Sequence, residues 1–184
     1  MKKLIIFCLT FVLSTSVLAN NSDSFTSNYS ILEPPKEVKF DVEQAKHFFN
    51  VAGGCLYIYM VQHKQATMAS LLEQSPAAED WRRTTEVEAR NWLKTGIFLE
   101  NTLVNHFNFQ PESIRAYKID QMQKLNSIYM QMFMELDTAE YFMRLLNGTG
   151  FCEINKPALF EFIELASKAN KEKFPQADKP KRRM

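Results

Sequence analysis

Apolar residues recur every three or four positions along most of the chain between residues 42 and 170, which is the spacing of amphipathic helices. The first run follows Asp41, which can cap a helix, with Gln44 three residues later. It passes through "VAGGCLYIYM" at 51–60. That stretch alone also fits a buried strand, but the stripe on both sides of it favours a helix. The stripe consists of Val42, Ala45, Phe49, Ala52, Leu56, Tyr59, His63 and Ala66.

Two further helices are predicted from their start signals. Ser75 followed by Pro76 is a cap with proline in the first turn, and it predicts the start of a second helix. Pro111 begins a third helix, which we expect to run to Asn147. The "NGTG" sequence at 147–150 should end it, because glycine commonly follows the last turn of a helix.

A fourth, shorter helix is expected to open at Asn155 and Pro157. Long helices joined by short links pack as antiparallel neighbours. The sequence therefore predicts an all-α single domain that resembles a four-helix bundle and covers residues 39–171.

The first residues have the layout of a secretory signal peptide. Lys2 and Lys3 precede an apolar run at 4–12, and Val17 and Ala19 are small residues suited to a cleavage site. A transmembrane helix needs about 20 apolar residues. This run is shorter, and no later stretch is long and uncharged enough. We therefore expect cleavage near Ala19, a periplasmic or secreted protein, and no transmembrane segment in the mature chain.

Three segments thus lie outside the predicted helical domain. Residues 1–19 are predicted to be the signal peptide, 20–38 a flexible leader and 172–184 a disordered basic tail. Removal of the signal lowers the basic residues from 22 to 20 and leaves the 21 acidic ones. The mature chain is then nearly neutral, with no strong overall field to attract nucleic acid.

Two cysteines, Cys55 and Cys152, remain after Cys8 leaves with the signal. An even number of cysteines in an exported protein predicts one disulfide, and no Cys-x-x-Cys pair supports the alternative of a reactive thiol. An up-down-up bundle would place Cys55 roughly 25 Å from the end of the third helix. Residues 147–152 span at most about 18 Å. Either the first helix breaks near Gly53-Gly54 or the third stops early.

Residues suited to metal or cofactor chemistry are scattered, so we expect no metal site and no cofactor. His47, His63 and His106 lack the short spacings of a zinc site. Methionines stand at every second position of "YMQMFM", 129–134, and their thioethers could bind Cu(I). Residues two apart on a helix point in different directions, however, so they do not form one site. A carrier of haem, copper or lipid in the bundle core stays an alternative.

Signatures of hydrolases are missing, so the protein is not expected to be an enzyme. There is no Gly-x-Ser-x-Gly motif and no phosphate-binding glycine loop. A hydrolase with a carboxylate pair remains a second alternative. The carboxylates that this alternative would draw on are Glu86, Glu88, Glu135 and Glu140.

Aromatic residues make up 12% of the chain, and three of them are candidates for contact with a partner. Tyr57, Tyr59 and Trp81 are of the types that anchor protein interfaces. The alternative is that these rings cover the core and keep their polar ends in water.

Two cysteine-containing segments, "GGCLYIYM" and "GFCEINKPALFEF", resemble small periplasmic immunity proteins of the type VI secretion amidase class. The long middle segment has no counterpart in that class. The resemblance implies a helical protein that binds another protein. Together with the missing catalytic signatures, it favours an exported, non-catalytic protein-binding protein, such as an adaptor, inhibitor, chaperone or immunity protein. Its partner would be another exported or envelope protein.

Overall fold

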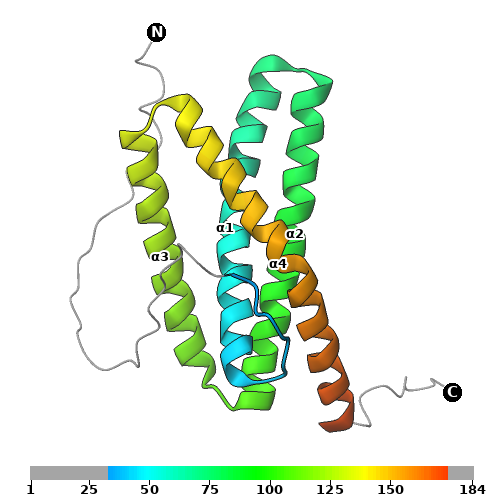
Figure 1. Cartoon of the computed structure of the whole chain (residues 1–184). Coiled ribbons are helices and arrows are strands. Elements are labelled where there is room, and N and C mark those ends of the chain that lie inside the picture. The colour runs from blue at the N-terminus through cyan, green and yellow to red at the C-terminus, as the bar shows by residue number, and fades with distance from the viewer. Residues whose placement is uncertain (1–32, 174–184) are drawn as a thin grey trace, which may run out of the picture. The chain divides into compact units, whose positions relative to one another are not determined.

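The computed structural model describes residues 33–173, which contain helices and no strand (Figure 1). The helices are α1 (Val42–Glu73), α2 (Pro76–Phe107), α3 (Pro111–Glu135) and α4 (Thr138–Lys173). The predicted all-α, bundle-like fold is therefore confirmed. The predicted signal peptide, most of the leader and most of the tail lie outside the described residues.

The starts of α1 and α2 form as the sequence predicts. The Asp41 side chain accepts a hydrogen bond from the backbone N–H of Gln44 at 2.8 Å. Ser75 accepts one from the N–H three residues after it at 3.2 Å, and Pro76 occupies the first turn. Each cap satisfies a backbone donor that the first helical turn leaves without a partner.

The third helix begins at Pro111 as predicted, but the prediction that it runs to Asn147 is wrong. Its chain is divided by a break at Leu136, whose φ of −91° and ψ of 151° are extended. Asp137 then caps α4 by accepting the N–H of Glu140 at 2.9 Å. A side chain that competes for backbone N–H groups in this way ends one helix and starts the next.

The predicted stop at "NGTG" and the predicted start at Pro157 are also wrong, because α4 continues through both. Gly148 stays helical because it packs against α1. A Cβ at this position would lie 3.0 Å from the Ile58 side chain, so glycine permits the close approach. Tertiary packing therefore overrides the local stop signal.

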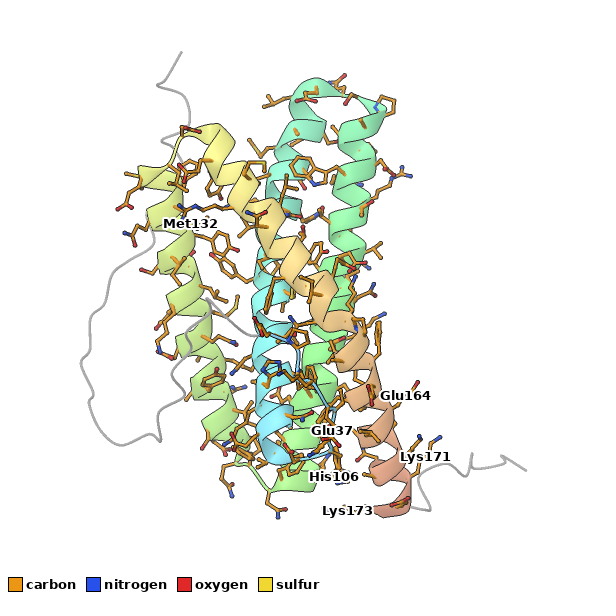
Figure 2. All side chains as sticks on the ribbon, viewed as in Figure 1. Glu37, His106, Met132, Glu164, Lys171 and Lys173 are labelled. Atoms are coloured by element: carbon orange, nitrogen blue, oxygen red, sulfur yellow. A yellow bond between two sulfur atoms is a disulfide. The ribbon has the colours of Figure 1, made fainter. Side chains whose placement is uncertain are left out.

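Helix α1 contacts each of the other three helices. Helix α2 runs antiparallel beside it, while α4 crosses the α1–α2 pair obliquely and α3 lies along another side of α1 (Figure 1). At its end, α4 docks on the last turn of α2. Lys173 donates to the backbone carbonyl of Asn105 at 2.6 Å, and His106 Nε2 lies 2.6 Å from Asn170 Oδ1 (Figure 2). A cation suits this helix end, where the macrodipole is negative.

The predicted disulfide between Cys55 and Cys152 is confirmed, and it joins α1 to α4 in the core. Its Cα atoms are 5.7 Å apart, and both residues are fully buried. The third helix stops early, which is one of the two solutions that the sequence left open, and α1 continues unbroken through Gly53-Gly54. The largest fully buried side chains among the described residues include Phe48, Phe162, Leu99, Leu145, Leu159 and Val51.

Candidate functional site

One side of α1 forms the floor of a small apolar hollow between α2 and α3, where Phe49 is only 5% exposed. Phe49, Gly53 and Leu56 lie on this side at spacings of three and four residues, so they form a stripe along the helix. Met60 lies one turn further on the same face and is 49% exposed. Residues of α2 and α3 form the walls. We call this feature the α2–α3 groove.

The wall supplied by α2 is apolar and reaches from the core to solvent. Trp92 is buried at its base, and its indole N–H has no hydrogen-bond partner among the described residues. Leu93 and Ile97 form the rim and are 49% and 48% exposed. Gly96 lies between them, and a Cβ there would meet nothing within 4 Å. The wall therefore has large apolar side chains on either side of open space.

The wall supplied by α3 combines one apolar and two polar side chains, Met122, Lys118 and Gln121. Gln121 is buried, and its amide donates to the backbone carbonyl of Asn50 at 3.3 Å. It also passes so close to Gly53 that a Cβ there would lie 3.0 Å from its Cδ. The missing side chain at Gly53 thus lets α3 approach α1.

Two hollows border α3 and share Lys118 and Met122, and α2 lines only the inner one. The inner hollow, between the three helices, has a volume of about 60 Å³. The outer hollow measures about 490 Å³, is wide open to solvent, and is also lined by Tyr57, Ile119 and Asn126. Pockets that enclose small molecules usually have volumes of about 300–1,000 Å³. An inner hollow this small suits single apolar side chains of a larger partner.

Among the described residues that line the two hollows, Lys118 alone is charged. Lys118 reaches across from α3 to Glu100 on α2, with 2.8 Å between ammonium and carboxylate. Lys64, Lys94 and Arg115 are exposed and make no ion pair with any other residue that the structure describes. None of these three residues is among those that line the two hollows.

The predicted contact residues Tyr57 and Tyr59 are buried rather than displayed. Tyr57 is 9% exposed at the edge of the outer hollow, and its hydroxyl donates to Asn126 at 3.0 Å. Tyr59 is 6% exposed, and its hydroxyl donates to Glu153 on α4 at 3.2 Å. Burial raises the pKa of both phenols, and the Glu153 carboxylate raises that of Tyr59 further. Only the edge of Tyr57 borders the groove.

The third predicted contact residue, Trp81, is half-buried near the start of α2 and does not line the groove. A binding role for Tyr57, Tyr59 or Trp81 stays a prediction. The sequence predictions did not include the groove residues Leu93 and Ile97. Their signal in the sequence is two apolar residues one helical turn apart.

A polar cluster beside the disulfide links three helices. Lys156 on α4 lies 3.2 Å from Glu88 on α2 and 2.6 Å from Glu153. Glu153 in turn accepts the hydroxyl of Tyr59 on α1. The cluster positions α4 against the α1–α2 pair, so we assign it a structural role.

The carboxylates considered for a hydrolase do not form a pair. Each has a different partner, and the two acids of α2 face bases of different helices. The hydrogen bond from Arg90 lowers the pKa of Glu86, whereas a general acid needs a raised pKa. The partners are Arg82 and Arg90 for Glu86, Lys156 for Glu88, Gln131 for Glu135, and Arg144 for Glu140.

The three histidines lie at separate places in the fold. His47 is half-buried against Phe48, and burial lowers its pKa, partly opposed by a hydrogen bond with Asn155. His63 Nδ1 lies 3.1 Å from the carbonyl of Arg82, and His106 contacts the end of α4. Among the described residues, no three His, Cys, Asp or Glu side chains gather into a metal-binding group.

The methionines of the alternating run lie near the end of α3, where Met132 is visible (Figure 2). Met134 is 76% exposed, while Met132 is partly buried.

Over residues 33–173, none of the helices combines the length and hydropathy of a membrane span.

Fold and site together define an all-α protein whose helices are stapled by one disulfide and flank an open apolar groove. Searches of protein-family models, curated proteins and solved structures find no match to this chain.

Proposed function

We propose that this protein is an exported, non-catalytic protein-binding protein, and that its partner docks in the α2–α3 groove. The observation that carries the proposal is the exposed apolar wall at Leu93 and Ile97, which borders the hollow between α1, α2 and α3. Soluble proteins rarely leave large contiguous apolar surfaces open to water unless they bind something there.

The geometry of the groove favours a protein over a small molecule as its occupant. The inner hollow of about 60 Å³ is much smaller than a pocket that encloses a haem or lipid. The outer hollow is wide but open, so a ligand there would keep much of its surface in water. A protein partner can fill the inner hollow with a side chain and cover the outer one with its backbone.

Site-specific photocrosslinking in the cells that make the protein tests this proposal. A benzophenone amino acid at Ile97, on the groove rim, should yield a crosslinked protein adduct. The same amino acid at Ile154, which is 62% exposed on α4 and outside the groove, should not. The adduct is then identified by mass spectrometry.

The captured protein must also bind the purified chain. We expect Leu93→Glu to weaken that binding at least about tenfold, which corresponds to about 1.4 kcal/mol, because it places a charge on the apolar rim. Ile154→Glu is the matched control and should leave the affinity unchanged. Equal crosslinking at both positions, or no effect of Leu93→Glu, would overturn the assignment of the groove.

A further inference from the structure

Helix α3 has a second, largely apolar stripe beside the face that packs on the core. Its members follow one another at spacings of three, four, four and three residues, so they share one face of the helix. We call them the α3 stripe: Ile119, Met122, Asn126, Met130 and Phe133. Ile119 and Phe133 are 54% and 53% exposed, and Met130 is 37% exposed. The stripe is therefore a helix face that the fold leaves open to water.

No charged side chain interrupts the α3 stripe. The charged residues between 119 and 133 are Asp120 and Lys124, which pair with each other at 2.8 Å. Successive residues of a helix are turned by about 100°, so this pair lies on another side of α3. An exposed stripe of large apolar residues without charge is typical of a surface that packs against another helix.

The α3 stripe is the same in both directions from Asn126. Met122 and Met130 are each four residues from it, and Ile119 and Phe133 are each seven residues from it. Two copies of α3, antiparallel about a two-fold axis at Asn126, would place Met122 of each against Met130 of the other. Ile119 would likewise meet Phe133. A two-fold contact requires a surface that matches itself in this way, and an unrelated partner does not.

The shape of the surface matches itself as well. Ile119 and Met122, on one half of the stripe, line the outer hollow of about 490 Å³. Phe133, on the other half, is largely exposed and contacts the Tyr141 ring edge-on, with 5.7 Å between ring centroids. The same two-fold axis would place Phe133 of each copy over the outer hollow of the other.

Polar groups at the axis and at the ends favour this register. Asn126 is exposed, and its amide nitrogen donates to none of the residues that the structure describes. The two Asn126 amides could bond to each other, as a single asparagine in an apolar stripe fixes the register of paired helices. Arg115 lies eleven residues before Asn126 and Asp137 eleven after it, and both are exposed. The axis thus brings opposite charges together at both ends.

We infer that two copies of this chain associate through the α3 stripe, antiparallel about a two-fold axis at Asn126. The inference goes beyond the proposed function, which concerns a different protein. Both occupants would cover the outer hollow, so they compete there, and the dimer is the form without the partner. One helix face from each copy makes a small interface, so the association should be reversible.

A single cysteine at the axis tests the register, because a residue on a two-fold axis faces its own copy. Asn126→Cys should give a disulfide-linked dimer on oxidation, since such a bond needs Cα atoms within about 7 Å. Lys124→Cys, on another side of α3, is the matched control and should stay monomeric. Cys55 and Cys152 are already bonded to each other and buried. No dimer from Asn126→Cys, or as much from Lys124→Cys, overturns the inference.

Sedimentation equilibrium of the purified chain, from about 1 to about 100 µM, should show a monomer–dimer equilibrium. We expect Ile119→Glu to weaken the association at least about tenfold, because it places a charge on the apolar stripe. Ile154→Glu, on α4 and outside the stripe, is the control and should leave it unchanged. Monomer at every concentration, or an equal effect of the two substitutions, overturns the inference.

The charged ends of the stripe give a separate test of the antiparallel register. Arg115→Glu should weaken the dimer, because it would face Asp137 of the second copy. Asp137→Asn keeps a side chain that can cap α4, and it should restore part of the association of Arg115→Glu. No restoration overturns this register. Circular dichroism and urea unfolding show whether each variant is folded, while the crosslinking at Ile97 separately decides the proposed function.

Discussion

At the residue scale, two glycines on neighbouring helices serve different purposes. Gly53 makes room for the buried Gln121 amide, while Gly96 faces open space in the groove. Glycine inside a helix costs about 0.5–1 kcal/mol relative to alanine. Only at Gly53 does a tertiary contact in the free protein compensate that cost.

The two glycines therefore give a matched pair of variants. Gly96→Ala should raise the free energy of unfolding by about 0.5–1 kcal/mol through helix propensity alone. Gly53→Ala should lose this gain, because its Cβ displaces the Gln121 amide from Asn50, and its stability should fall about 1–2 kcal/mol below that of Gly96→Ala. Urea unfolding measures both. Equal stabilisation by both alanines would contradict the packing at Gly53.

At the element scale, α2 and α4 are held against α1 in different ways. Helix α2 lies against α1 along its length, whereas α4 crosses obliquely and is joined to α1 by the Cys55–Cys152 bridge (Figure 1). The bridge closes a loop of 97 residues in sequence separation. In the chain-entropy model such a loop stabilises the fold by about 4–5 kcal/mol.

Replacing both cysteines by alanine should lower the free energy of unfolding by about 4 kcal/mol. The denaturant slope should rise, because the unfolded chain without the bridge exposes more surface. Urea unfolding of the double variant and of the oxidised parent measures both quantities. A loss below about 1 kcal/mol would show that the non-covalent contacts of α4 suffice.

The sequence predicted the elements whose signals are local, and it failed where tertiary contacts decide. Asp41 and Ser75 mark helix starts because each side chain caps its own first turn. The stop predicted at Gly148 failed because the contact with Ile58 holds that glycine in a helix. Asp137, the actual cap, follows a run with no glycine or proline to mark the break.

The same distinction explains the candidate site. Leu93 and Ile97 are apolar and one helical turn apart, but this spacing does not show which positions lack a covering helix. Tyr57 and Tyr59 were predicted to contact a partner because they are aromatic, yet their hydroxyl groups donate hydrogen bonds to residues of the same chain. Exposure depends on the angles between helices, which one sequence does not encode locally.

At the scale of the whole molecule, one intact-mass measurement tests both removal of the signal peptide and formation of the disulfide. Protein purified from its own cells should begin at Asn20 if the proposed signal is cleaved after Ala19. Its intact mass should be about 2 Da below that of the reduced chain, because a disulfide in an oxidising compartment has lost two hydrogens. Intact-mass and N-terminal analysis test this. A retained Met1 or a fully reduced mass would contradict export.

The sequence separation of the two disulfide-bonded cysteines also means that Cys55 is synthesised well before Cys152. A ribosome adds about 5–20 residues per second, so Cys152 follows Cys55 by roughly 5–20 seconds. During that interval the neighbouring α1 and α2 segments are both available to pair, while the Cys55 thiol still awaits its partner. Once the proposed signal with Cys8 is removed, Cys55 is the one cysteine of the nascent chain until Cys152 is made. An oxidoreductase that acts during synthesis therefore meets Cys55 before Cys152.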